Sequence, residues 1–162
     1  MNIQKLKREV CIHEASHAVI ADLLGMPIKK IVIDYKHRDI YCMIGMWNIR
    51  ELDIAVTIAG WVADNIINKH NVKFNKSIGA SDDFKKVKKF RLKPREFNSI
   101  SKIVYSAVRK HKKIIVKLAK YLLSIERNFK SILGKGKFNE FIKNNLIPDS
   151  YKKNFLLKLV GI

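Results

Sequence analysis

Cysteine is scarce in this sequence, and its scarcity excludes one class of protein. The two cysteines, Cys11 and Cys42, form neither a C-x-x-C pair nor a set of spacings typical of a disulfide framework. A small secreted domain held together by disulfides is therefore excluded. We expect a reduced, cytoplasmic protein.

Long apolar runs are also missing. No run approaches the roughly 18–20 residues that a helix needs to span a bilayer, and the opening residues MNIQKLKREV lack the apolar block of a signal peptide. We therefore expect no transmembrane segment. A chain of 162 residues that is 48% hydrophobic can bury a core of its own, so residues 1–162 are predicted to form a single domain.

Acidic residues are few relative to basic ones. The 33 Lys and Arg residues outnumber the 14 Asp and Glu residues, giving a formal net charge of +19. Such a balance can attract nucleic acid, an anionic membrane surface or an acidic protein. The lysine runs at residues 85–89 and 109–113 contain no aromatic residue that could stack on a base. This favours a solvated surface, with an anionic partner as the alternative.

Apolar residues recur at helical spacing in most of the chain, and two short segments rich in β-branched residues interrupt the pattern. The predicted helices cover residues 3–24, 51–70, 81–93, about 98–126 and 137–146, with a further turn or two near 155–159. The predicted strands cover residues 28–34 and 40–47. The fold class is therefore mainly α (α+β), with a small β-sheet or hairpin near the N-terminus. Gly60, inside the second helix, predicts a close approach to another backbone.

The first predicted helix contains the stretch CIHEASHAVIADLLG, in which two histidines lie four residues apart. On a helix His13 and His17 share one face, so that both imidazoles can bind one metal ion. Glu14 is rotated by about 100°, outside the metal's ligand set but close to a water that zinc activates. A chance match to H-E-x-x-H in a chain of this length is on the order of 1%. The alternative is two ordinary histidines on a helix.

A catalytic zinc site needs a third protein ligand besides the two histidines. The candidates are Asp22, His37, Asp64, His70, Asp82, Asp83, His111 and Glu126. Asp22 points away from His17, and His70 and His111 lie in lysine-rich surroundings that predict solvent exposure. The residues alone leave Asp64 and the Asp82–Asp83 pair open. Cys11 is rotated by roughly 200° from His13 and is expected in the core.

Three motifs resemble, in order and spacing, the peptidase domain of the FtsH-type membrane-bound AAA+ zinc proteases. They are HEASHAVIADLLGMPIKKIVI from His13, IAGWVAD at residues 58–64 and GASDDF at residues 79–84, and the likeness extends over about residues 9–145. The resemblance implies a Zn²⁺ ion bound by His13, His17 and Asp83, with Glu14 as the catalytic base. It also implies that Asp64 orients a ligand histidine and that Trp61, where the family has arginine, packs in the interior.

The resemblance further implies a substrate site along the strand at residues 40–47, where Met43, Ile44 and Gly45 would bind an extended polypeptide. The sequence departs from the family in containing no G-x-x-x-x-G-K-[ST] motif, so we expect a peptidase for unfolded or flexible polypeptides. A homo-oligomer and a separate ATPase partner are possible. The alternative is a non-proteolytic regulatory or binding protein on the same scaffold, with a basic surface for nucleic acid or an acidic partner.

Overall fold

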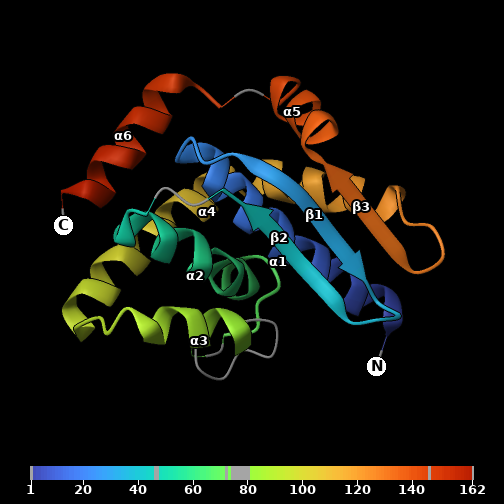
Figure 1. Ribbon diagram of the computed structural model, residues 1–162, viewed down its shortest axis with the longest axis horizontal. Coiled ribbons are helices and arrows are strands. Elements are labelled where there is room, and N and C mark those ends of the chain that lie inside the picture. Colours follow the sequence, from blue (N-terminus) through green and yellow to red (C-terminus); the bar gives the residue numbers. More distant parts are fainter. Residues whose placement is uncertain (1, 46–47, 72, 74–80, 146, 162) are drawn as a thin grey trace.

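The computed structural model describes residues 2–45, 48–71, 73, 81–145 and 147–161 (Figure 1). Parts of the sequence-based predictions lie outside these residues. They are Met46 and Trp47 at the end of the second predicted strand, most of the loop at residues 71–79, Gly79 and Ala80 of the third motif, and Leu146.

The described chain is mainly helical and carries one small antiparallel sheet, as the sequence predicts. The helices are α1 (Ile3–Leu23), α2 (Arg50–Ile66), α3 (Ser81–Lys89), α4 (Pro94–Ser124), α5 (Lys135–Lys143) and α6 (Asp149–Val160). The strands are β1 (Ile28–Asp34), β2 (Asp39–Ile44) and β3 (Lys130–Gly134).

Helix α1 lies at the centre of the molecule, with α2, α4 and the sheet packed around it (Figure 1). The Asn2 side chain caps its first turn by accepting hydrogen bonds from the backbone N–H groups of Gln4 and Lys5. Every residue from Cys11 to Ala21 is buried, including the polar ones. A helix that is apolar on nearly all sides is stable only when surrounded by other elements. The histidine motif is therefore inside the protein.

The sheet has the strand order β2-β1-β3, with both neighbours antiparallel to β1. Ile31 pairs with Cys42 on one side and Leu133 on the other, and these positions face the helices. Strand β2 is thus an edge strand of the described sheet. Strand β3 was not predicted, because its five residues show little periodicity and it forms only by pairing with β1, about 100 residues earlier in the chain.

Helix α4 begins at Pro94, although the sequence placed its start at residue 98 or 99. Proline fits the first position of a helix, where no backbone N–H is needed, and the Glu96 carboxylate accepts a hydrogen bond from the Lys93 N–H. Other boundaries differ as well. Helix α2 ends at Ile66, α5 spans residues 135–143, and α6 is a full helix rather than one or two turns.

The core is formed by the facing sides of α1, α2 and α4 and by the inner face of the sheet. Cys11 and Trp61 are buried in it, as predicted. No helix within the described ranges is both long enough and apolar enough to cross a membrane.

Candidate metal centre

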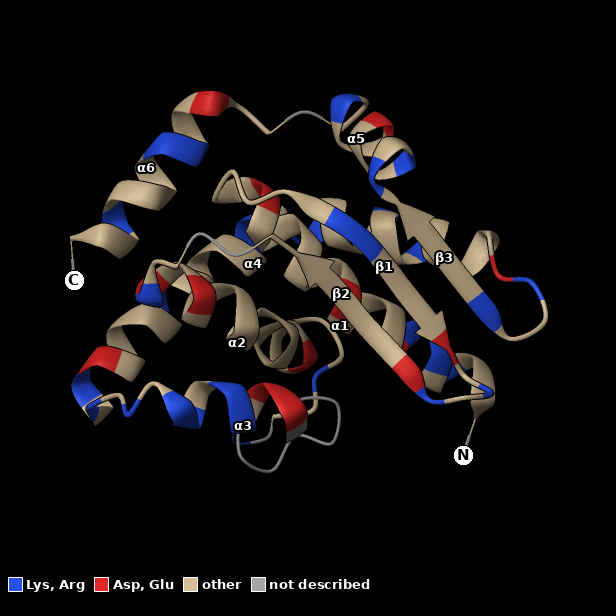
Figure 2. Cartoon of the chain, in the orientation of Figure 1, with Lys and Arg blue, Asp and Glu red and all other residues tan. Residues whose placement is uncertain are grey.

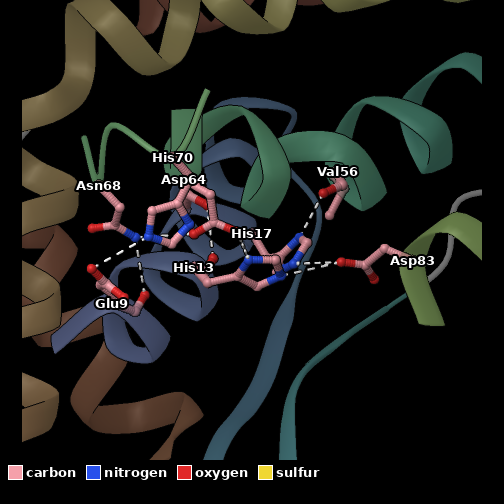
Figure 3. A network of polar contacts seen from close by, with 9 residues as sticks. Glu9, His13, His17, Val56, Asp64, Asn68, His70 and Asp83 are labelled. Atoms are coloured by element: carbon pink, nitrogen blue, oxygen red, sulfur yellow. Dashed lines mark hydrogen bonds and ion pairs between the residues drawn. The ribbon is translucent and has the colours of Figure 1, made fainter. Parts of the chain in front are cut away.

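Three helices bring the predicted site residues together. Helix α1 provides His13, Glu14 and His17, α2 provides Asp64, and α3 provides Asp83 from its first turn (Figure 3). All five residues are buried. Helix α3 carries acidic residues at its start and basic residues after them, an order that complements the helix dipole (Figure 2).

The Asp83 carboxylate lies at the same distance from both histidines. Its Oδ2 atom is 3.2 Å from His13 Nε2 and 3.2 Å from His17 Nε2. Ligand atoms placed tetrahedrally around a zinc ion at about 2.0–2.1 Å are separated from one another by about 3.3 Å. These two separations match those expected between ligands of a tetrahedral metal site. The ligand atoms of His13, Glu14 and His17 lie within 4.8 Å of one another, so Glu14 borders the same position.

The second ring nitrogen of each histidine is held by a hydrogen bond. His17 Nδ1 donates to the Val56 carbonyl at 2.7 Å, and His13 Nδ1 lies 2.9 Å from Asp64 Oδ2. A carbonyl only accepts, so the proton of neutral His17 is on Nδ1 and its Nε2 lone pair is free. Such contacts fix the tautomer and orientation of a metal-binding imidazole.

Asp64 belongs to a chain of polar contacts that continues away from the metal position (Figure 3). Its Oδ1 accepts a hydrogen bond from Asn68 Nδ2 at 3.0 Å, and Asn68 also donates to the Glu9 carbonyl. The Glu9 carboxylate in turn lies 3.3 Å from His70 Nε2. The His70 backbone N–H donates to the Asp64 carbonyl, and its partly exposed imidazole is not in contact with His13 or Asp83 (Figure 3).

Gly60 of α2 makes room for the His13 ring. A Cβ atom at this position would lie 2.2 Å from His13 Nε2 and 2.4 Å from its Cε1. The close approach predicted for Gly60 exists, but its partner is an imidazole side chain rather than the backbone of another element. The glycine thus sets the position of one candidate ligand.

Charges around the two imidazoles favour positive charge at this position. Burial lowers the pKa of His13, but its hydrogen bonds to Asp64 and Asp83 outweigh burial and raise the pKa to about 10. Burial also lowers the pKa of His17. The attraction of the Asp83 carboxylate outweighs burial, so the pKa of His17 is raised as well. Burial raises the pKa of Asp83, but the imidazoles hold that pKa well below its usual range. The carboxylates that keep protons on the imidazoles would equally favour a divalent cation at this position.

Glu14 has a different environment from Asp83. Burial raises the pKa of its carboxyl, and the nearby imidazoles only partly oppose that shift. A carboxylate with a raised pKa is a stronger base than an exposed one. Glu14 is therefore suited to accept a proton from a water molecule.

A cavity of about 910 Å³ opens over these residues, between β2, α2 and α3. Its walls include residues 38–42 of the β2 region, Ile44, Gly45, Asp53, Thr57, Lys86 and Lys89. Of the predicted substrate-binding residues, Ile44 and Gly45 line the cavity. Met43 does not line it, and its side chain is exposed.

The remaining candidate ligands have other partners. Asp22 pairs with Lys152, His37 with Asp34, Asp82 with Lys85, and Glu126 with Lys7. His111 was predicted to face solvent, and that prediction is wrong. It is 7% exposed, because it lies on the inner side of α4 and packs edge-on against Tyr151 of α6.

Several site residues were not found from the sequence. The Val56 carbonyl has no side-chain signal, and Asn68, Asp53 and Lys89 reach the site only through long-range packing. The spacing of four residues between Asp64 in the last turn of α2 and Asn68 just beyond the helix was the one local hint.

Neither protein-family models nor curated protein sequences give a match to this chain. The site itself defines a buried position bordered by two imidazole nitrogens, a carboxylate oxygen and a second carboxylate, at the floor of a cavity.

Proposed function

We propose that this protein is a zinc-dependent metallopeptidase that hydrolyses peptide bonds in unfolded or flexible polypeptides. The observation that supports this most is the position of Asp83 Oδ2, 3.2 Å from both histidine Nε2 atoms, with the buried Glu14 carboxylate beside them. His13, His17 and Asp83 would hold the ion. A zinc ion there would lower the pKa of a water molecule and polarise the substrate carbonyl.

The residues of this chain divide the work of hydrolysis among them. Glu14 accepts one proton of the attacking water, whose oxygen bonds to the carbonyl carbon. The C–N bond then breaks, and Glu14 delivers the proton to the departing amine nitrogen. Asp64 and the Val56 carbonyl keep the imidazoles oriented throughout.

The cavity supports an extended polypeptide as substrate. One wall is β2, an edge strand of the described sheet whose outer backbone groups can pair with an added strand. Ile44 and Gly45 bring this edge to the cavity that holds Glu14. Only a segment without its own secondary structure can add to a sheet edge in this way. A homo-oligomer or a separate ATPase would be a means of delivering such segments.

Two adjacent aspartates provide a matched test of the site. Asp83→Asn should abolish zinc binding, measured by metal content after dialysis, and hydrolysis of unfolded casein should fall to background. Asp82→Asn, one residue earlier in α3, should retain one zinc per chain, because Asp82 is exposed and pairs with Lys85. Zinc contents that are equal in the two variants would contradict the proposed ligand set.

A further inference from the structure

The exposed side of α4 is almost uniformly basic. Between residues 102 and 120 its exposed positions are Lys102, Ser106, Arg109, Lys110, Lys112, Lys113, Lys117 and Lys120. At 100° per residue, six of the cations fall within an arc of about 100°. We call these six residues, Lys102, Arg109, Lys110, Lys113, Lys117 and Lys120, the α4 basic stripe. It extends for about 27 Å along the helix.

The charges of the α4 basic stripe are not neutralised. Across the described part of the chain, none of its six cations forms an ion pair with a carboxylate, and α4 has no acidic residue after Glu96. Lys110 Nζ lies 3.8 Å from the centre of the Tyr151 ring, and Lys117 donates a hydrogen bond to Asn145. Neither partner carries a negative charge, so the stripe retains its attraction for a polyanion.

A cavity of about 710 Å³ adjoins the N-terminal half of the stripe and has aromatic walls. Trp61 of α2 lies there with its ring centroid 6.1 Å from that of Phe97 and 5.6 Å from that of Tyr105. Ser101 also lines the cavity, and its buried Oγ has no hydrogen-bond partner among the described residues. The cavity thus offers aromatic rings and a polar group beside Lys102 and Arg109.

The basic runs of the sequence contain no aromatic residue, but the fold places aromatic side chains beside cations of the α4 basic stripe. The fold supplies the aromatic rings from α2 and from the first turns of α4. We propose that the α4 basic stripe and this cavity together bind single-stranded nucleic acid. Phosphates would lie along the stripe, and an unstacked base would enter the cavity, stack on Phe97 or Tyr105 and accept a hydrogen bond from Ser101.

Two other polyanions fit the same surface less well. A duplex keeps its bases stacked and would leave the aromatic cavity without a role. An anionic membrane requires apolar side chains beside the cations for insertion, whereas the apolar side of α4 is buried against α1 and α2. The site shares no lining residue with the metal cavity, so this proposal is independent of the proposed peptidase activity.

The test measures binding of 12-nucleotide oligouridylate and oligodeoxyuridylate by fluorescence anisotropy at several salt concentrations. Two sets of three substitutions remove equal charge from exposed positions. The stripe variant is Lys102→Gln/Arg109→Gln/Lys113→Gln, and the control on α5 is Lys135→Gln/Lys137→Gln/Lys143→Gln. The stripe variant should bind roughly tenfold more weakly or worse, and its plot of log affinity against log salt should be shallower by about 2. The control should keep the slope of the unmodified protein.

The aromatic cavity is tested separately. Phe97→Leu should weaken binding by roughly fivefold to a hundredfold and leave the salt slope unchanged, because stacking releases no counterions. In a Trp47→Phe background Trp61 is the single tryptophan, and its fluorescence should change when the oligonucleotide binds.

Four outcomes would overturn the proposal. They are equal salt slopes for the stripe and control variants, an unchanged affinity of Phe97→Leu, a 12-base-pair duplex bound as tightly as the single strands, and tighter binding to phosphatidylserine vesicles than to either oligonucleotide. A difference between the two oligonucleotides decides between RNA and DNA as the ligand, since only RNA offers the 2′-hydroxyl.

Discussion

At the scale of single residues, the site depends on how the His13 ring is held. Gly60 lies against one face of the ring, Asp64 binds its Nδ1 and Asp83 lies at its Nε2. Each contact comes from a helix other than α1. The ring is thus fixed by tertiary packing, and changes in α2 should alter the proposed metal site without touching any of its proposed ligands.

Gly60→Ala should displace the His13 ring. The added methyl group would overlap the imidazole, and overpacking of this kind costs about 1–3 kcal/mol. We expect a lower free energy of unfolding in urea and weaker zinc binding. Gly136→Ala is the matched control, because a Cβ atom there meets nothing within 4 Å. Equal stability of the two variants would contradict the packing described for His13.

Asp64 is expected to act through His13. Asp64→Ala removes the acceptor at Nδ1 and should weaken zinc binding by roughly 10–100-fold. Asp64→Asn keeps a neutral acceptor and should have a smaller effect. Zinc affinities can be measured by competition with a chromogenic chelator. An unchanged affinity of Asp64→Ala would show that Asp64 does not position the ligand.

The local part of the site could be predicted from the sequence, whereas its completion could not. The spacing of His13, Glu14 and His17 on one helix is sufficient to predict two ligands and a base. The residues alone left Asp64 and the Asp82–Asp83 pair open, and Asp83 was implied only by the family resemblance, since 70 residues separate it from His13. The Val56 carbonyl belongs to the backbone and leaves no trace in the residue types.

At the scale of secondary-structure elements, Asp34 stabilises the end of β1 and the turn that follows. Its Oδ1 accepts hydrogen bonds from the backbone N–H groups of Lys36 and His37, and its Oδ2 lies 3.0 Å from both His37 Nδ1 and Lys130 Nζ. The carboxylate thereby joins the β1–β2 turn to the start of β3. The hydrogen bonds from His37, with that from Lys130, hold its pKa well below the usual range.

This shift predicts an acid-dependent loss of stability. Because the pKa of Asp34 is lower in the folded than in the unfolded state, its contribution is complete above the ordinary value of 3.8 and is lost as the pH falls below it. Asp34→Asn should therefore lower the Tm at pH 7 and reduce the difference in Tm between pH 7 and pH 3. A Tm difference equal to that of the unmodified protein would contradict this role.

Elements defined by local signals were predicted well, and those that depend on distant partners were not. The limits of β1 match the prediction because its β-branched residues are all buried. The start of α4 was placed too late because proline is both a helix breaker and a favoured first residue. The hydrogen bond from the Lys93 N–H to the Glu96 carboxylate shows that Pro94 is the first residue of the helix. A glutamate three residues after position 93 could have indicated this start in the sequence.

At the scale of the whole molecule, the central position of α1 explains the burial of the site. The α1 motif is covered by α2 on one side and the sheet on another, and α3 adds Asp83 from a third direction. The fold class could be predicted from hydrophobic periodicity. The placement of Trp61 beside α4 could not be predicted in this way, because it depends on how α2 and α4 cross.

Zinc should stabilise the whole fold. If the ion binds only the folded chain, a free concentration of 100 times Kd contributes about 2.7 kcal/mol, or a Tm increase of roughly 5–10 °C. The ion must displace the protons that the raised pKa values of His13 and His17 retain, so the increase should be larger at pH 8 than at pH 6. Differential scanning calorimetry with and without zinc measures it. A larger increase at pH 6 would contradict the assignment of the two imidazoles as ligands.

The most direct test of the central claim compares hydrolysis of an unfolded polypeptide by the zinc-loaded protein and by its Glu14→Gln variant. The substitution preserves size and removes the base. We predict that both forms hold one zinc per chain, that the unmodified protein cleaves the substrate, and that the variant is at least about 100-fold slower. Cleavage by the variant at the unmodified rate, or no cleavage by the fully zinc-loaded protein, would contradict the proposed peptidase.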